Sequence, residues 1–387
     1  MIAANWPVQR PRDARLLVVD AHGRIAHAPR SRFIDFLKPG DLVIANDAAT
    51  LPASLRGVHV PTGAPIEVRL AGHRCQTRGQ NYSVSATEFS AIVFGAGDFR
   101  TRTEDRPLPP ALAPGDCLVF PPAASDAAGV PPSGVEGLSA TVEALLDHPR
   151  LVLLRFRGPT QAVWAGLARY GRPIQYAHMS TPLAMWDVWT PIAALPAAFE
   201  PPSASFALDW GSIRAMRGRG ITFATITLAA GISSTGDPEL DRRLPFDEHY
   251  RIPETTASAV REIRTTGGRV IAIGTTVVRA LEHAAARHGV VRAGEGIADQ
   301  RIGPGSPLRI VDAILSGTHE PGGSHYQILR AFLDDATLAD ADAVLEARGY
   351  RTHEFGDSVL IERQETRCQT PYICDSVSDQ GLVTTAA

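Results

Sequence analysis

A buried strand that runs directly into a helix is the feature that most constrains the fold of this chain. Residues 267–282 read GGRVIAIGTTVVRALE, with an apolar run at residues 270–273 followed by Gly274 and two threonines. A short continuous apolar run is typical of a strand that is covered on both faces of a sheet. The helical pattern that follows at once therefore predicts layered α/β structure at this point.

The rest of the chain extends this prediction into two kinds of structure. Residues 56–158 are short β-rich segments separated by Gly and Pro turns, which is typical of an antiparallel barrel or sandwich. Helical patterns alternate with strands from about residue 160 onward. We predict a large α/β domain built from both ends of the chain, with an inserted antiparallel β-barrel domain. The predicted divisions are residues 1–60 and 159–363 for the α/β domain, 61–158 for the barrel and 364–387 for a weakly ordered C-terminal extension.

Composition excludes several classes of protein. No apolar run approaches the ~20 residues of a membrane span, and the first residues lack the basic and apolar regions of a signal peptide. We therefore expect a cytoplasmic protein that has no membrane partner. The four cysteines form no C-x-x-C pair or zinc-finger spacing, so no metal is expected. The net charge of −3 and the single lysine, Lys38, give no global footprint for nucleic acid, although a local arginine patch remains open.

The start of the predicted helix at Thr275 and Thr276 has two interpretations. In one, a threonine side chain caps the helix, and Arg279 forms an ion pair with Glu282 or Glu254. In the other, free backbone N–H groups and hydroxyls hold a carboxylate or phosphate.

Two other segments place polar side chains at or near a strand. Asn46 and Asp47 follow the apolar run in VIANDAATL, where a turn or a ligand contact is expected. Glu67 alternates with Ile66 and Val68 in GAPIEVRL, so it lies on the opposite face of that strand. Its position fits either a solvated strand face or a functional carboxylate.

Histidines in a glycine-rich loop are the remaining candidates for proton transfer. His319 and His325 flank a Gly-Gly pair in GTHEPGGSHYQIL, and their spacing matches no metal motif. Loop histidines are either solvated or carriers of protons near neutral pH. Asp357 lies at a Gly-Asp turn in YRTHEFGDSVLI, which a hairpin explains adequately.

Taken in order, these segments resemble one family. LKPGDLVIANDAATLPASL, TGAPIEVRL, GGRVIAIGTTVVRALE, PGSPLRIVDAIL, THEPGGS and YRTHEFGDSVLI are similar to motifs of the S-adenosylmethionine:tRNA ribosyltransferase-isomerase family of queuosine biosynthesis. The resemblance implies an α/β domain with an inserted β-barrel. It also implies a transferase and isomerase that uses S-adenosylmethionine (SAM) as a ribosyl donor. The implied acceptor is the aminomethyl group of a 7-deazaguanine in tRNA, and the implied products are epoxyqueuosine, adenine and methionine.

The resemblance also assigns roles to residues at matching positions. Such chemistry needs a base, a proton for adenine, and anchors for the carboxylate and ribose hydroxyls of the donor. The expected catalytic residues are His319, Glu67 and Asp47, and the expected SAM-binding residues are Asn46, Thr275, Thr276, Arg279 and Asp357.

The sequence departs from the family pattern at several of its motifs. Ala207 and Ala229 stand where the family has histidines, Val277 replaces a serine, and Glu320 follows His319. Three functions stay open for such a diverged member. They are the family reaction on tRNA, a related SAM reaction with a small-molecule acceptor, and SAM binding without turnover. The arginines of a local tRNA patch would be Arg10, Arg12 and Arg15, or Arg214, Arg217 and Arg219.

Overall fold

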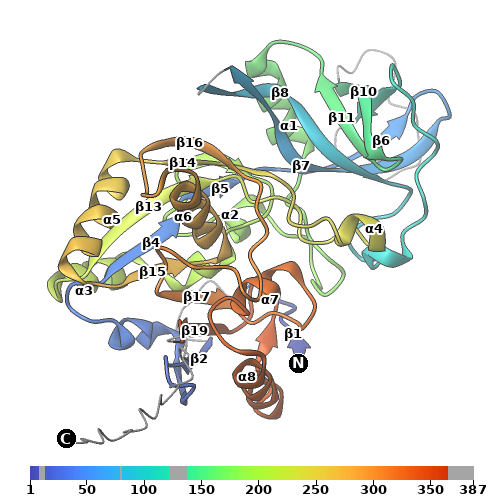
Figure 1. Ribbon diagram of the computed structural model, residues 1–387. Helices are drawn as coiled ribbons and strands as arrows, with labels where there is room; N and C mark the ends of the chain where they lie inside the picture. Colours follow the sequence, from blue (N-terminus) through green and yellow to red (C-terminus); the bar gives the residue numbers. More distant parts are fainter. Residues whose placement is uncertain (8–13, 79–80, 122–136, 365–387) are drawn as a thin grey trace, which may run out of the picture.

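The buried strands assemble into one nine-stranded mixed sheet (Figure 1). The computed structural model describes residues 1–7, 14–78, 81–121 and 137–364. The predicted C-terminal extension lies outside these residues except for its first position. In spatial order the strands are β16 (Gly294–Ala298), β14 (Glu248–Ile252), β13 (Thr222–Leu228), β4 (Leu42–Asn46), β15 (Val270–Ile273), β17 (Ala313–Gly317), β19 (Ser358–Glu362), β2 (Arg15–Val19) and β3 (Ile25–Pro29).

The directions of the strands give this sheet one edge that is suited to ligand binding. β13, β4, β15 and β17 are parallel neighbours, so their carboxyl ends meet at the same edge. β14 is antiparallel to β13, so its first residue, Glu248, also lies there. Ligands of open α/β sheets bind outside the carboxyl ends of the strands. The topology therefore points to this edge before any side chain is considered.

Alternation along the central strands separates two apolar layers. Leu42 and Ile44 of β4 face one cluster, whereas Val43 and Ala45 face another. The first cluster is covered by α5 (Glu254–Thr266), α6 (Thr275–His288), α7 (Ser324–Leu329) and α8 (Asp335–Ala347). The second is covered by α3 (Trp210–Gly218) and the 3₁₀ helices η2 (Arg30–Phe36) and η4 (Ser203–Ala207).

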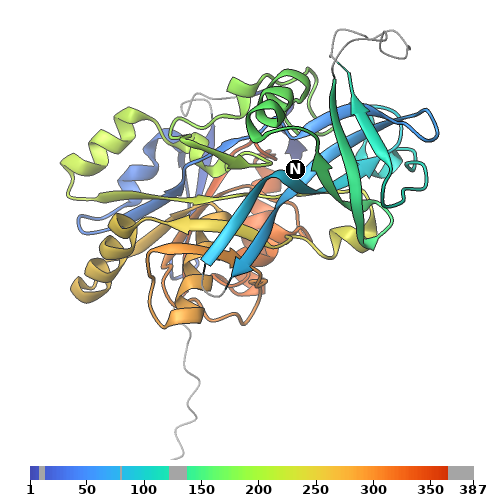
Figure 2. The ribbon, with the colours of Figure 1, turned by 90° about the horizontal axis from the view of Figure 1, so that it is seen from above.

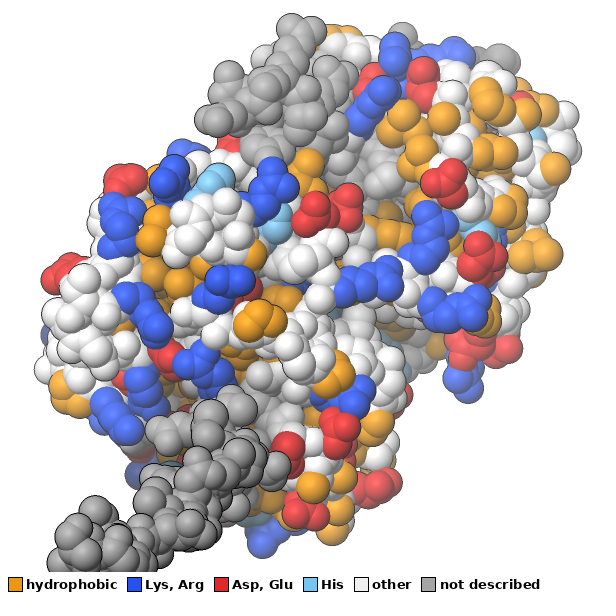
Figure 3. Space-filling model, viewed as in Figure 1, with side chains coloured by type: hydrophobic (Ala, Val, Ile, Leu, Met, Phe, Trp, Pro, Cys, Tyr) orange, Lys and Arg blue, Asp and Glu red, His pale blue; other side chains and the backbone are white. Residues whose placement is uncertain are grey.

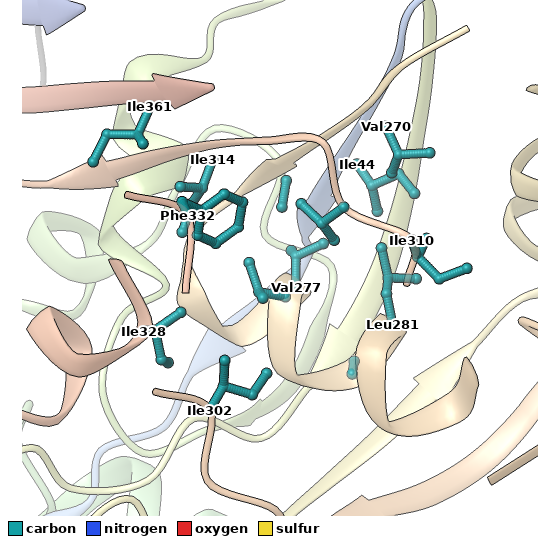
Figure 4. Close-up of a cluster of buried hydrophobic side chains, with 14 of the residues drawn as sticks. Ile44, Val270, Val277, Leu281, Ile302, Ile310, Ile314, Ile328, Phe332 and Ile361 are labelled. Carbon is teal, nitrogen blue, oxygen red and sulfur yellow. The ribbon is translucent and has the colours of Figure 1, made fainter. Parts of the chain in front are cut away.

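Helix α6 lies at the centre of the first layer. Figure 4 shows Val277 and Leu281, four residues apart on one face of α6, with Ile44 and Val270 of the sheet close by. Burial of a residue of this size contributes about 1.5–3 kcal/mol. Packing on this scale fixes the position of the start of α6, which lines the candidate active site described below.

The second body is a closed six-stranded antiparallel barrel (Figures 1 and 2). Its interior is an apolar cluster that includes Phe89, Phe120 and Phe156, and α1 (Thr160–Tyr170) packs Val163 and Leu167 against it. The barrel strands, in spatial order, are β10 (Leu138–His148), β11 (Leu151–Phe156), β8 (Asn81–Phe94), β7 (Ala64–Arg78), β6 (Ser54–His59) and β9 (Cys117–Phe120). The predicted α/β class with an antiparallel barrel is confirmed. The β-rich segments form a barrel and not a sandwich.

The expected domain boundary at residue 60 does not coincide with the start of the barrel. β6 is a barrel strand that precedes this boundary, so the division of the chain into domains stays a proposal. The remaining elements are β1 (Ile2–Ala3) paired with β18 (Arg351–Thr352), β5 (Ala48–Thr50) paired with β12 (Leu195–Ala198), α2 (Met185–Val188), α4 (Pro238–Asp241) and η3 (Thr103–Asp105). Among the described residues, no helix combines the length and apolar character needed to cross a membrane.

Candidate active site

A cleft lies at the carboxyl edge of the parallel strands. It encloses about 70 Å³ and continues, through Pro245, Arg279, Ser324 and Ile328, into a neighbouring hollow of about 420 Å³. Together they reach the range of about 300–1,000 Å³ that is usual for small-molecule sites. The polar residues that line the cleft are Glu200, Ser203, Ser233, Glu248, Thr275, Thr276, Arg279, Ser316, His319, Ser324 and His325.

The start of α6 opens into this cleft without a side-chain cap. The N-cap is Gly274, at φ +94°, and not a threonine, so the expected threonine cap is wrong. A glycine suits this positive φ, and Ala204 lies 3.4 Å from where a Cβ would be. With the threonines inside the helix, the first N–H groups face the cleft with the partial positive charge of a helix start. Asn46 donates from Nδ2 to Thr276 Oγ1 at 3.4 Å and to the Leu228 carbonyl at 2.9 Å. This geometry favours the anion-binding interpretation.

Arg279 is held by a partner that the sequence did not indicate. Its guanidinium forms a buried ion pair with Glu248 at the start of β14, and it also donates to the carbonyl of Ala298 at 2.6 Å. The expected partners are wrong: Glu282 instead accepts from the backbone N–H groups of residues 309–311, and Glu254 lies on α5. The buried Nε of Arg279 has no hydrogen-bond partner among the described residues. The pair therefore leaves one donor available at the cleft wall.

The imidazole rings of two histidines lie next to each other in the lining of the cleft. The rings of His319 and His325 are 4.9 Å apart, and His319 Nε2 lies 2.9 Å from Ser316 Oγ. Burial, and then the charges of His325 and His353, hold the pKa of His319 well below its ordinary value. Burial and the nearby Arg279 also lower the pKa of His325. Both shifts favour the neutral imidazole, which can accept a hydrogen bond at one ring nitrogen and donate one from the other.

Glu200 is a cleft carboxyl that the sequence analysis missed. It is 7% exposed and accepts from the Tyr176 hydroxyl at 2.5 Å and from the Ser233 backbone at 3.1 Å. Burial, and then the charge of Glu354, raise its pKa to about 7. A carboxyl of this kind is poised to exchange protons at neutral pH. Its sequence context, AAFEPPS, contains no motif that would have indicated it.

Glu67 lies on barrel strand β7, on the face opposite to the barrel-core residues Ile66 and Val68, and not in the cleft. Its carboxylate accepts from Arg69 Nε at 2.8 Å, Arg106 Nη1 at 2.5 Å and Ser54 Oγ at 2.8 Å. The two guanidinium groups lower its pKa despite burial. The solvated strand face is therefore wrong, because Glu67 is only 3% exposed. Arg69 extends the network toward the cleft, with its guanidinium 5.3 Å from the ring of Tyr176.

Two further predicted residues also lie outside the cleft. Asp47 accepts from the hydroxyls of Thr225 at 2.7 Å and Thr227 at 2.6 Å on the neighbouring strand. Asp357 is fully buried and accepts from the backbone and guanidinium of Arg15. The Asp357 carbonyl accepts from the Thr318 backbone at 3.1 Å, next to His319. Of the eight predicted residues, Thr275, Thr276, Arg279 and His319 line the cleft, and Asn46 contacts it through Thr276.

The two alanines that replace family histidines are packed in apolar surroundings. Ala207 is 2% exposed in the layer under α3, and Ala229 is 6% exposed in the cluster that fills the barrel. Neither lines the cleft. The structure therefore accommodates both substitutions as small core residues.

Arginines of the two candidate patches differ in their surroundings. Arg214 and Arg217 are exposed on α3, whereas Arg219 contacts the carbonyl of Ile34 at 2.8 Å. Arg15 is engaged by Asp357, and residues 10 and 12 lie outside the described residues. Figure 3 shows blue side chains spread over one face, interspersed with red and orange ones.

A cleft at the carboxyl edge of parallel strands, lined by titratable groups with shifted pKa values, defines an enzyme-like α/β protein. Residues 1–361 match the model of a protein family described as "Queuosine biosynthesis protein". The chain belongs to this family.

Relatives across most of the chain carry one name. The S-adenosylmethionine:tRNA ribosyltransferase-isomerase of Thermus thermophilus is 32% identical, over 91% of this chain and 93% of that protein. The protein of the same name from Sorangium cellulosum is 32% identical over 93% and 95%. A solved structure of an S-adenosylmethionine tRNA ribosyltransferase from Thermotoga maritima covers 93% of this chain and 96% of that chain, at 22% identity and a TM-score of 0.47.

Proposed function

We propose that this protein transfers the ribosyl part of SAM to a modified base of tRNA and isomerises it, releasing adenine and methionine. The relatives reported above are named S-adenosylmethionine:tRNA ribosyltransferase-isomerases, which supports a ribosyl transfer from SAM to tRNA. The observation that carries the proposal is the cleft itself, which joins an uncapped helix start to groups able to move protons. The alternative of a small-molecule acceptor has no support from these relatives. The alternative of SAM binding without turnover is separated from the proposed reaction by the test below.

The donor is held by the start of α6 in this proposal. The methionine carboxylate of SAM accepts from the free N–H groups at Thr275 and Thr276, where the helix dipole favours an anion. Asn46 holds Thr276 in place by donating a hydrogen bond to its hydroxyl, and Arg279 lines the cleft beside it. Carboxylates at the cleft, such as Glu200, favour the cationic sulfonium by simple charge attraction.

Proton transfer falls to Glu200 and His319. The sulfonium of SAM acidifies the neighbouring C5′ hydrogens, so a base can remove one and start the loss of adenine. Glu200 is our choice for this base, because its pKa of about 7 matches neutral pH. His319, held by Ser316, is our choice for the neutral imidazole that relays this proton from Glu200 to the departing adenine, accepting at one ring nitrogen and donating from the other. The acceptor amine then attacks the sugar, and an oxygen displaces methionine.

Residues outside the cleft keep a positioning role in this proposal. Asp47 secures the neighbouring strand, Asp357 supports the loop that carries His319, and Glu67 pairs with two buried arginines of the barrel region. Exposed arginines such as Arg214 and Arg217 on α3 offer phosphate contacts for tRNA.

The test is a SAM incubation with quantification of adenine and methionine by mass spectrometry. It is run with and without tRNA that carries the aminomethyl-deazaguanine base. We expect release that depends on this tRNA, and a loss of about 10²–10⁴-fold in the Glu200→Gln variant. Release that is equal without tRNA would reject the proposed acceptor. Binding of SAM with no release under either condition would reject the proposed reaction.

A further inference from the structure

Two imidazoles and a carboxylate converge behind the candidate active site. His178 Nε2 lies 3.1 Å from Glu354 Oε2, and the rings of His178 and His353 stack at 4.1 Å with an interplanar angle of 14°. One ligand atom from each of the three residues lies within 4.8 Å of the others. The described residues contain no second cluster of this kind.

The spacing of these atoms suits a metal ion. Around zinc, with bonds of about 2.0–2.1 Å to nitrogen and oxygen, ligand atoms in a tetrahedral site lie about 3.3 Å apart. The three atoms lie within 4.8 Å of one another, so reaching this spacing requires their separations to shorten by about 1.5 Å at most. Two histidines and one glutamate also form a known catalytic type of zinc site, in which water fills the fourth position.

The surroundings hold these ligands in place and leave one side open. The ring of Tyr176 continues the stack, 6.2 Å from His178 at an interplanar angle of 17°. His178 and Glu354 are mostly buried, whereas the side chain of His353 is 36% exposed and gives an ion access from solvent. Glu320 lies 4.0 Å from His353 Nε2, so a second carboxylate faces the open side. Such neighbours orient the ligands of metal sites.

The two segments that supply the ligands come from distant parts of the chain. His178 lies in the loop between α1 and α2, and His353 and Glu354 lie between β18 and β19. His353 adopts φ +70°, which a non-glycine residue rarely does. Glu354 and Glu200 line the same small hollow next to the main cleft. The cluster therefore adjoins the candidate active site without being part of the proton-transfer set.

We propose that His178, His353 and Glu354 bind one divalent transition-metal ion, with an open coordination position toward Glu320. This inference goes beyond the proposed function and does not depend on it. It also differs from the expectation of no metal, because the sequence spacing of the three ligands matches no metal motif.

The test titrates the full-length, chelator-treated protein with Co²⁺ and follows the visible absorption of a protein-bound ion. We expect one equivalent per chain and displacement by Zn²⁺. The variants His353→Gln and Glu354→Gln should each bind at least about 10-fold more weakly, since even an outer-shell partner is typically worth 10–100-fold in affinity. His148→Gln is the matched control, because His148 is similarly buried and lies 3.4 Å from a carboxylate of Asp237. This control should bind as the unmodified protein does.

Three results would overturn the proposal. One is the absence of stoichiometric Co²⁺ binding by the unmodified protein, a measurement that does not depend on the folding of any variant. Another is unchanged affinity in His353→Gln and Glu354→Gln proteins that keep the unmodified circular dichroism spectrum. The third is thiolate-type absorption that disappears after Cys368→Ser and Cys374→Ser substitution, because the ion would then belong to those cysteines.

Discussion

Replacing Glu67 by glutamine is expected to destabilise the barrel and not to remove a catalytic group. The side chains of Glu67, Arg69 and Arg106 are only 4%, 1% and 1% exposed. The Arg69 and Arg106 guanidiniums lie 4.7 Å and 5.4 Å from the ring of Phe94, and Arg150 lies 4.7 Å from the same ring. Glu67 is the carboxylate that contacts two of these three cations.

The magnitude follows from the two ion pairs. Opposite charges about 4 Å apart attract by about 4 kcal/mol at an effective dielectric constant near 20. Much of this attraction offsets the cost of removing the charges from water. Removing one partner of a buried pair typically costs about 3–5 kcal/mol, because the remaining charge stays buried. We therefore expect Glu67→Gln to lower the free energy of unfolding by about 3–5 kcal/mol.

The assay is urea unfolding followed by circular dichroism, with kcat measured on the folded fraction. As a control, Glu67→Gln is combined with Arg106→Met, which removes one of the stranded cations and should recover part of the loss. A loss of stability below about 1 kcal/mol, together with a kcat lowered by 10²-fold or more, would refute this reasoning. That outcome would return Glu67 to the catalytic role expected from the family resemblance.

Three further outcomes follow from the cleft. Arg279→Met leaves Glu248 buried without its cation, so we expect a loss of about 3–5 kcal/mol in urea unfolding, and a neutral result would contradict the buried ion pair. His319→Gln is expected to lower kcat by about 10²–10⁴-fold while the Kd for SAM, measured by calorimetry, changes little. A large change in Kd with an unchanged kcat would assign His319 to binding instead. Glu200 becomes the ionised base only as the pH rises through its pKa of about 7, so kcat/KM of the chelator-treated enzyme should rise through that range, and Glu200→Gln should remove this limb. An identical pH profile for this variant would exclude Glu200 as the base.

Local patterns were sufficient for the fold class and for one wall of the cleft. The apolar run before Gly274 and the helical period after it are both short-range features, so they predicted the strand and α6 correctly. The same features located Thr275 and Thr276, since a glycine at a strand-to-helix turn exposes the helix start. The identity of the N-cap was wrong, because Gly274 at φ +94° takes that position itself and both threonines lie inside the helix.

The remaining parts of the site depend on contacts between distant segments. The sequence placed Glu67 on a strand, but only the tertiary fold brings Arg106, in the segment between β8 and β9, to its carboxylate. Glu200 carries no motif, and its pKa is raised by burial that tertiary packing alone produces.

The sequence by itself determined the secondary structure, the layered α/β class and the family, because periodicity and short motifs are properties of neighbouring residues. Tertiary structure decided which charges meet. Arg279 pairs with Glu248 and not with Glu282, which is much closer along the chain. His178 likewise lies beside His353 and Glu354, which are far from it in the sequence. The physical reason is that burial and electrostatic partners depend on distances in space, which the order of residues along the chain does not specify.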